Sequence, residues 1–397
     1  MLFSREILNK IKKVIDRDEF IILVGARQTG KTSLLFLIKE FYENKGVEAS
    51  YFNLENPEHL KILNDHPFNI FDLLPKRPAK QIVLIDEIQY LADPSNFLKL
   101  LYDDRRKEIK IIATGSSSFY MDRKFKDSLV GRKFIFNIYP LNFNEFLEFN
   151  GETEMAEAKP AKKLTSYYQT KLLKLWEQYI IYGGYPKVAL AREEELKKIL
   201  IEDIGSSYIK KDALEAGIKN TEKYYALIKI LAGQTGQLMN SQELANTLNI
   251  AHKTVEEYLY IMARSYQLAF IRPFYKNLRK ELTKMPKAYF YDLGLRNFFL
   301  DDFSSLDKRP DKGAYLENLV FTEFLKRGDS LDKIKYWRTQ DKKEVDFIIG
   351  REAYEIKYNL KRKASGYKKF IEQYPEIKFS MVSREDVIKK FYGRKGA

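Results

Sequence analysis

The 397-residue chain contains no cysteine and only three histidines. Without cysteine there can be no disulfide and no thiolate metal site, and His59, His66 and His252 are too scattered for a histidine-rich metal centre. Any metal must therefore be held by oxygen ligands. No apolar run reaches the ~18 residues that a membrane helix needs. No signal peptide is visible either, because Met1–Asp16 has the pattern of an amphipathic helix. These absences predict a cytoplasmic protein with no membrane partner.

Positive charge is in excess. The chain has 69 Lys and Arg against 55 Asp and Glu, which gives a formal net charge of +14. Such a charge favours a polyanionic partner, and nucleic acid, DNA in particular, is the first candidate. The alternative is a solvated basic surface of the kind found in Lys/Glu-rich proteins of thermophiles. At about 150 residues per domain, the length predicts two or three domains.

A phosphate-binding motif follows the first apolar run. Phe20–Val24 is followed by G-A-R-Q-T-G-K-T, Gly25–Thr32, and then by an amphipathic helix pattern from Lys31. The segment fits G-x-x-x-x-G-K-[ST] at every fixed position. Glycines let backbone N–H groups approach a polyphosphate, Lys31 supplies charge to the terminal phosphates, and the Thr32 hydroxyl suits Mg²⁺. A chance glycine-rich turn would rarely have a buried strand before it and a helix after it. We therefore predict that the chain binds ATP and Mg²⁺.

The first 150 residues alternate between strand and helix patterns, which predicts an α/β domain with a mostly parallel sheet. The expected strands are Phe20–Val24, Glu48–Leu54, Gln81–Asp86, Ile109–Thr114 and Phe134–Tyr139. The third strand ends in two carboxylates, the form of a Walker B segment. Asp86 is expected to hold the Mg²⁺ shell and Glu87 to polarise the attacking water. The alternative for such an acidic pair is a helix cap or a solvated strand end.

The strand Glu48–Leu54 is expected to lie between the phosphate-loop strand and the Walker B strand. With a glutamate beside the Walker B aspartate, this arrangement resembles the AAA-type ATPases more than the small GTPases. The resemblance implies a polar sensor residue at the end of the next strand, where Thr114 and Ser116 are the candidates. A serine-rich strand end is otherwise ordinary turn chemistry. The residues expected to contact the nucleotide are Gly25, Ala26, Arg27, Gln28, Thr29, Gly30, Lys31, Thr32, Ser33, Asp86, Thr114 and Ser116.

Phosphoryl transfer also calls for a guanidinium group, which a neighbouring subunit often supplies. Arg132 is the preferred candidate, with Arg123, Arg105 and Arg106 as competitors. Any one of these arginines can instead be an ordinary surface charge. A finger supplied by another subunit would make the protein a homo-oligomer.

Two further motifs make the resemblance more specific. Pro140–Phe146 reads P-L-N-F-N-E-F and Gly183–Pro186 reads G-G-Y-P. They are similar to the P-L-S-F-x-E-[FY] and G-G-[YF]-P signatures of a prokaryotic and archaeal AAA-like ATPase family. Its members carry a C-terminal domain of unknown function that resembles restriction endonucleases of the PD-(D/E)xK type. The likeness covers nearly the whole chain, but it implies no particular biological role.

The middle of the chain is predicted to be helical. Residues 151–161 form a polar loop, and helical patterns follow from Leu164 to about Ala216 with an interruption at Gly183–Gly184. The resemblance implies that residues 151–221 form a helical lid over the nucleotide, and a helical spacer is the alternative.

Residues 222–300 are predicted to form a winged helix. A helix capped at Asn240, a second helix at Lys253–Ala263 and a hairpin within Phe270–Tyr291 support this interpretation. Glu256 and Glu257 on the second helix would repel DNA, so the basic hairpin is the expected contact. Its basic residues are Arg272, Lys276, Arg279, Lys280, Lys284 and Lys287. The alternative is a module that contacts protein.

After a polar linker at Asp301–Lys312, the last module, within residues 301–397, begins with a helix at Ala314–Lys326. Glu317 lies inside the apolar run of this helix, which is unusual for a carboxylate unless a neighbour neutralises it. Glu344–Ile349 and Ala353–Lys357 then read as a hairpin through Gly350. Strand alternation places Glu355 and Lys357 on one face, and pairing brings Asp346 beside them.

These residues outline a second catalytic centre. Two or three carboxylates can hold Mg²⁺ against a phosphodiester, and a lysine can orient the attacking water. Asp346 and Glu355 are the predicted metal ligands, Lys357 is the catalytic lysine, and Glu317 matches the glutamate that the first helix contributes in restriction-endonuclease-like enzymes. The alternative is an inactive nuclease whose charges pair with one another, Lys357 with Glu355 or Asp346.

The chain from Arg351 onward has 13 Lys and Arg against 6 Asp and Glu, and such a tail could follow a sugar-phosphate backbone. Its interleaved aromatic residues are more often part of a core. Two hypotheses for the whole chain follow: an ATP-regulated DNA-processing nuclease, or an ATP-dependent switch that binds DNA or a partner without cutting.

Overall fold

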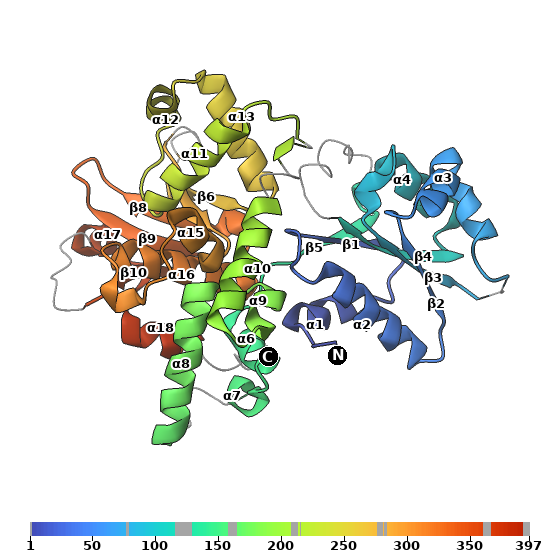
Figure 1. Ribbon diagram of the computed structural model, residues 1–397, viewed down its shortest axis with the longest axis horizontal. Helices are drawn as coiled ribbons and strands as arrows, with labels where there is room; N and C mark the ends of the chain where they lie inside the picture. The colour runs from blue at the N-terminus through green and yellow to red at the C-terminus, as the bar shows by residue number, and fades with distance from the viewer. Residues whose placement is uncertain are drawn as a thin grey trace. The chain divides into compact units, whose positions relative to one another are not determined.

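The structure is a computed structural model that describes residues 2–76, 79–115, 129–157, 165–207, 213–214, 216–275, 281, 284–359 and 367–391. The chain divides into two compact units (Figure 1). The first comprises Met1–Tyr139 with Arg264–Tyr266, and the second comprises Pro140–Ala263 with Gln267–Ala397. The backbone therefore passes between the units after Tyr139, after Ala263 and after Tyr266.

The first unit is built on a five-stranded parallel sheet with the order β2-β3-β4-β1-β5. Continuous apolar runs form its central strands, because these strands are buried on both faces. Its elements are α1 (Glu6–Lys12), β1 (Phe20–Val24), α2 (Lys31–Glu43), β2 (Ala49–Asn53), α3 (Pro57–Asp65), η1 (Pro67–Asp72), β3 (Gln81–Asp86), η2 (Ile88–Tyr90), α4 (Pro94–Arg105), β4 (Ile109–Gly115) and β5 (Lys133–Asn137). All five predicted strands are confirmed within one or two residues at each end.

The predicted place of the second strand was wrong. β4, not β2, lies between β1 and β3, and β2 is at the edge of the sheet. The burial of the strands gives the physical reason. Every residue of β4 is buried, whereas β2 is buried only at Ala49 and Phe52, as suits a strand with one neighbour.

Helices cover both faces of this sheet. α1 and α2 lie on one side and α3 and α4 on the other (Figure 1). The core of the first side joins Leu8 and Ile11 of α1 with Leu34 and Ile38 of α2 and with strand residues such as Ile112. The N-terminal helix is shorter than predicted, since it spans only Glu6–Lys12.

The second unit combines helices with a mixed sheet. Its helices are α6 (Phe143–Phe149), α7 (Thr153–Glu157), α8 (Ser166–Tyr182), α9 (Pro186–Leu190), α10 (Glu194–Ser207), α11 (Thr221–Gly233), α12 (Ser241–Leu248), α13 (His252–Arg264, which crosses into the first unit), α15 (Leu293–Leu300), η5 (Leu306–Lys308), α16 (Lys312–Lys326), η6 (Leu331–Lys333), α17 (Tyr367–Gln373) and α18 (Arg384–Phe391). Its strands are β6 (Leu268–Pro273), β7 (Lys287–Phe290), β8 (Ile334–Arg338), β9 (Glu344–Ile349), β10 (Glu352–Lys357) and β11 (Lys378–Ser383).

The six strands form one sheet with the order β11-β10-β9-β8-β6-β7. The sequence predicts a winged helix at residues 222–300, which contain β6 and β7, and a separate module at residues 301–397, which contain β8–β11. The parallel pairing of β6 with β8 joins the two sets into one sheet. The predicted hairpin is present as the antiparallel pair β6 and β7, preceded by the helices α11, α12 and α13. The winged-helix interpretation and the four-part division stay predictions.

The two signature motifs pack against each other in the second unit. The Leu141 N–H donates to the Gly184 carbonyl at 2.7 Å, and a Cβ on Gly184 would lie 2.3 Å from the Leu141 carbonyl oxygen. The Gly184 N–H donates to Asp292 at 2.8 Å, and the same carboxylate caps α15. The G-G-Y-P motif is therefore glycine-rich because two backbones and a buried carboxylate meet there.

The predicted polar linker at Asp301–Lys312 is instead a packed segment. Arg309 is only 2% exposed, and its guanidinium pairs with Asp302 at 3.2 Å and with Asp311 at 2.9 Å. Asp311 also pairs at 2.6 Å with Arg296, which is fully buried. Ion pairs within the segment and with Arg296 of α15 fix it in place, which its polar composition alone could not reveal.

Candidate nucleotide site and acidic centre

The phosphate loop connects β1 to α2 in a conformation that depends on its glycines. A Cβ on Gly25 would lie 2.2 Å from the carbonyl oxygen of Ile138, so only glycine fits beside that backbone. Gln28 and Gly30 both have positive φ, at 61° and 90°. The Thr29 hydroxyl closes the loop by donating to the Ala26 carbonyl at 2.8 Å. Gly25–Ser33, all predicted to contact the nucleotide, thus form one continuous segment that leads from β1 into the first residues of α2.

Lys31 and Thr32 occupy the first turn of α2. The Lys31 ammonium is buried and donates to the carbonyls of Gly25 at 3.1 Å and Ala26 at 2.8 Å. The Thr32 hydroxyl donates to Oδ2 of Asp86 at 2.7 Å. This bond joins the phosphate-loop threonine to the aspartate at the end of β3, 54 residues later in the chain.

The end of β4 completes the polar group around Asp86. The Thr114 hydroxyl donates to Oδ1 of Asp86 and accepts the Glu87 N–H at 2.9 Å. Glu87 has positive φ at 58°, and its carboxylate accepts a hydrogen bond from the side chain of Gln89. Parallel strands bring their carboxyl ends to one edge, and that is why β1, β3 and β4 place these residues together.

Two residues of the site were not predicted from the sequence. Arg5, which caps α1 and is 6% exposed, donates to the carbonyl of Thr29 in the phosphate loop. The Tyr51 hydroxyl, from β2, donates to Oδ2 of Asp86 at 3.1 Å. Burial and the charge of Asp86 raise the pKa of Tyr51, so the hydroxyl stays a donor at neutral pH. Neither residue belongs to the motif, so spacing gave no signal.

Some predicted residues do not join this group. Arg132 precedes β5, and its carbonyl accepts the N–H of Phe20, the first residue of β1. It therefore lies at the opposite end of the sheet from the phosphate loop of its own chain, where it pairs with Asp103 at 2.6 Å. Ser116 and Arg123 lie outside the described residues.

The hairpin of β9 and β10 has the predicted register. Tyr354 pairs with Phe347 and Ala353 with Ile348, which sets Glu355 opposite Asp346. Oδ2 of Asp346 accepts the N–H of Ile356 at 2.7 Å. Lys357 pairs with Oε1 of Glu355 at 2.5 Å. Asp346, Glu355 and Lys357 are thus gathered as the sequence predicted.

This acidic centre is buried. Asp346 and Glu355 are each 6% exposed. Burial raises the pKa of Asp346 well above its usual range, and the charges of Glu317 and Glu355 add to the effect. Burial also raises the pKa of Glu355, although Lys357 opposes that change. Burial works against the charge of Lys357, but the Glu355 carboxylate outweighs it and the pKa of Lys357 rises.

The neutralising partner that Glu317 requires is Lys287. The Lys287 ammonium, 1% exposed, pairs with Glu317 at 3.1 Å and also with Glu344. The Tyr289 hydroxyl donates to the same oxygen of Glu317. Burial opposes the charge of Lys287, but Glu317 and Glu344 hold the pKa of Lys287 above its ordinary value.

The prediction that Lys287 contacts DNA was therefore wrong, because the tertiary fold turns its side chain inward against two carboxylates. Of the other basic hairpin residues, Arg272 and Lys284 are exposed, whereas Lys276, Arg279 and Lys280 lie outside the described residues.

The three predicted carboxylates do not form a metal site together. Within the described ranges, no group of three or more His, Cys, Asp and Glu side chains is arranged to hold a metal ion. Glu317 is bonded to Lys287 and Tyr289 instead. The pair Asp346 and Glu355 keeps one feature that fits a cation, since Oε2 of Glu355 is buried and has no hydrogen-bond partner among the residues that the structure describes.

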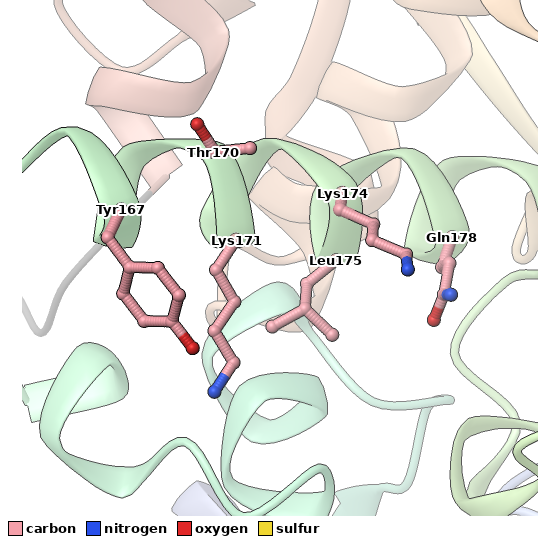
Figure 2. Close-up of a pocket in the computed structure, with 6 residues that line it drawn as sticks. All are labelled: Tyr167, Thr170, Lys171, Lys174, Leu175 and Gln178. Carbon is pink, nitrogen blue, oxygen red and sulfur yellow. The ribbon is translucent and has the colours of Figure 1, made fainter.

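A pocket of about 460 Å³ lies along α8. The lining residues that the structure describes all come from this one helix, and Figure 2 shows Tyr167, Lys171 and Leu175 projecting from the same side. Lys171 pairs with Glu152 at 2.5 Å. None of the predicted site residues within the described ranges lines this pocket. No helix in the described part of the chain is long and apolar enough to cross a membrane.

A relative from Haemophilus influenzae, described as an uncharacterized protein, is 30% identical over 370 residues, which cover 90% of this chain and 86% of that protein. The chain belongs to the same family. Another member, from Methanocaldococcus jannaschii, is 27% identical over 94% of this chain and 86% of its own length. A third, from Mycobacterium tuberculosis, is 25% identical over 91% and 74%.

Three domain descriptions match this family member in order. Residues 17–147 match an AAA domain, residues 173–306 a domain of unknown function (DUF8612), and residues 312–391 a domain of unknown function (DUF4143). The phosphate loop and the Walker B strand lie inside the AAA domain. The acidic centre draws Lys287 from the second match and Asp346, Glu355 and Lys357 from the third.

Solved structures give weaker likenesses. The RuvB Holliday junction branch migration motor of Thermotoga maritima has a TM-score of 0.35 at 15% identity, over 67% of this chain and 89% of that chain. The ORC1 protein of Aeropyrum pernix in complex with DNA has a TM-score of 0.34 at 12% identity, over 76% and 93%. Scores this low do not establish a shared function.

Proposed function

We propose that this family member is a Mg²⁺-dependent ATPase. The observation that carries the proposal is the hydrogen bond between Thr32 and Asp86, at the start of the helix that follows the phosphate loop. A threonine hydroxyl and a carboxylate are hard oxygen ligands, so these two residues would hold Mg²⁺. The ion, when bound, would neutralise charge on the phosphates.

The other residues of this edge have distinct roles in the proposal. Lys31 would exchange its bonds to the Gly25 and Ala26 carbonyls for bonds to the terminal phosphates. Glu87 would orient the attacking water and accept its proton, with Gln89 and Thr114 fixing its position. Arg132 faces away from this edge, so it could act as a finger only on a neighbouring copy. We therefore propose a homo-oligomer for hydrolysis.

Release of phosphate from ATP tests this assignment. Lys31→Ala should lose nucleotide binding. Glu87→Gln should keep binding and lose turnover by about 10²-fold or more, as expected for removal of a general base. Lys39→Ala is the matched control, because Lys39 lies on the same helix and pairs with Glu43, one turn later, at a partly exposed position. Wild-type turnover no faster than that of the two site variants would rule the assignment out.

For the second unit we propose nucleic-acid processing at the acidic centre. The specific support is the buried Oε2 of Glu355 beside Asp346, which no described residue contacts through a hydrogen bond, since a cation held by the two carboxylates would satisfy it. Such a cation could bind a phosphodiester, and Lys357, which already contacts Glu355, could orient water. The positive net charge of the chain supports DNA as substrate.

The alternative is an ATP-dependent switch that binds DNA or another partner without cutting it. The pairing of Lys357 with Glu355 and of Lys287 with Glu317 favours it, because these contacts also suit a closed structural cluster. Plasmid and linear DNA incubated with Mg²⁺ or Mn²⁺, with and without ATP, separate the two candidates.

In this experiment the nuclease predicts nicking that Asp346→Asn abolishes. Asp341→Asn should cut normally, because Asp341 is half exposed and pairs with surface lysines. Salt-sensitive binding without cleavage by the wild type would favour the switch.

A further inference from the structure

Arg5 lies ahead of the matched AAA domain, yet its side chain reaches the phosphate loop. It is the residue before α1 and is 6% exposed. Nη1 donates to the Thr29 carbonyl at 2.9 Å, and Nη2 donates to the Tyr139 carbonyl at 2.9 Å. One planar guanidinium thus joins the loop to the segment after β5. A fork with fixed geometry suits such a bridge, and lysine could not reproduce it.

The first of these bonds controls how the loop presents its N–H groups. No peptide in the described chain is cis, so the Thr29–Gly30 peptide is trans and its C=O and N–H point in opposite directions. For the Gly30 N–H to donate to a phosphate, the Thr29 carbonyl must point away from it. Arg5 holds the carbonyl in that direction, while the Thr29 hydroxyl is occupied by Ala26.

The second bond ends at a crossing between the two units. Tyr139 is the last residue of the first unit before Pro140. The preceding residue, Ile138, donates to Val24 at 2.7 Å, and its carbonyl oxygen is the atom that excludes a side chain from position 25. Another crossing lies beside it, because the Tyr266 hydroxyl donates to Asn137 at 2.7 Å and its ring packs against that of Tyr139.

We propose that Arg5 is a positioning residue for nucleotide binding that couples occupancy of the phosphate loop to the crossing at Tyr139. A phosphate that orders the Thr29–Gly30 peptide also orders the Arg5 guanidinium, and through it the Tyr139 carbonyl. The backbone that leaves the ATPase unit is thereby stiffened when nucleotide binds. This inference rests on the proposed binding of ATP by the phosphate loop.

The test uses the full chain and the ATP analogue AMPPNP with Mg²⁺. Calorimetry should show that Arg5→Met weakens binding by about tenfold or more, the loss expected when a charged donor to two carbonyls is removed. Arg5→Lys keeps the charge but not the fork, and its affinity should fall between those of Arg5→Met and the wild type. Arg17→Met is the control, since Arg17 is exposed and pairs with Glu19.

Hydrogen exchange measures the coupling. In the wild type, AMPPNP should slow amide exchange in residues 137–142 several-fold, and in Arg5→Met at saturating analogue this slowing should be lost while that of the phosphate loop remains. If Arg5 had only a structural role, Arg5→Met and Arg5→Lys would be less stable, but the slowing of exchange by AMPPNP would change equally in the phosphate loop and in residues 137–142. Wild-type chain that does not bind AMPPNP overturns the proposed function. Wild-type affinity and unchanged exchange at 137–142 in the Arg5 variants overturn this inference alone.

Discussion

At the scale of single residues, lysines in the core show how position changes chemistry. Lys110 on β4 is 2% exposed and donates to the backbone carbonyls of Arg17 and Glu19. Burial lowers the pKa of Lys110 to about 8, from an ordinary 10.5. Lys287 is equally buried, but two carboxylates keep it charged. The difference between the lowered pKa of Lys110 and the raised pKa of Lys287 comes from the paired carboxylates, since burial by itself always disfavours the charged ammonium.

The lowered pKa of Lys110 predicts a pH dependence of stability. Between pH 8 and 10.5 the folded state has released the Lys110 proton while the unfolded state still holds it. Stability rises with pH where the unfolded state binds more protons, so this group adds up to about 3 kcal/mol over that interval. Urea unfolding at pH 7 and pH 9.5 should show that the free energy of unfolding of the wild type, relative to that of Lys110→Met, is larger at the higher pH. An unchanged difference between the two proteins would contradict the prediction.

Removal of the Lys287 charge should be costly. Lys287→Met leaves the carboxylate of Glu317 without its buried cation, whereas Glu344 keeps its ion pair with Arg338. Breaking such a buried pair typically costs about 3–5 kcal/mol. Thermal unfolding at pH 7.5 measures the loss. Lys369→Met, which removes an exposed pair with Asp341, should change stability little.

At the scale of elements, the two family signatures act as packing motifs. Asn142 caps α6 and forms a capping box with Glu145, and the turn at Gly183–Gly184 fits against Leu141 and Asp292. Glu323 of α16, which is fully buried, accepts hydrogen bonds from Tyr179 and from the N–H of Phe143. These motifs therefore tie α6, α8, α15 and α16 together rather than contributing catalytic groups.

Alanine substitutions at two glycines distinguish the effect of close packing on stability from the effect of helix propensity. Gly184→Ala would place a Cβ 2.3 Å from the Leu141 carbonyl oxygen and should destabilise the second unit by about 1–3 kcal/mol. Gly313→Ala lies in α16 with no atom of a described residue within 4 Å of the new Cβ, and it should stabilise by about 0.5–1 kcal/mol. Denaturant unfolding of both variants checks the two signs. A neutral Gly184→Ala would contradict the packing role.

At the scale of the whole molecule, the net charge of +14 predicts electrostatic binding of nucleic acid. Contact with six to ten phosphates would lower affinity by about 10³–10⁵ between 50 mM and 200 mM salt. Fluorescence anisotropy with a short DNA duplex, repeated across salt concentrations with and without ATP, measures this slope. An affinity for DNA that does not change with salt would contradict the hypothesis that the positive net charge serves to bind DNA.

Sequence alone determined the five strands of the first unit, the hairpin of β9 and β10, and the residues close to one another along these strands and their loops. The phosphate loop, the Walker B strand and the hairpin that sets Glu355 opposite Asp346 follow from local periodicity and from glycine and turn chemistry. The same local logic indicated that Glu317 needs a partner inside its apolar run. Local rules suffice there because backbone pairing and side-chain alternation act over a few residues.

Only the tertiary structure decided which distant residues meet. It placed β4 beside β1, joined β6 to β8 across a predicted boundary, brought Lys287 to Glu317, and set Arg5 against the phosphate loop. These contacts depend on how the layers of secondary structure pack and on which residue of opposite charge lies close enough to pair with each buried charge. Many arginines and lysines in the chain have the right chemistry, and sequence spacing does not distinguish them, because burial selects the partner.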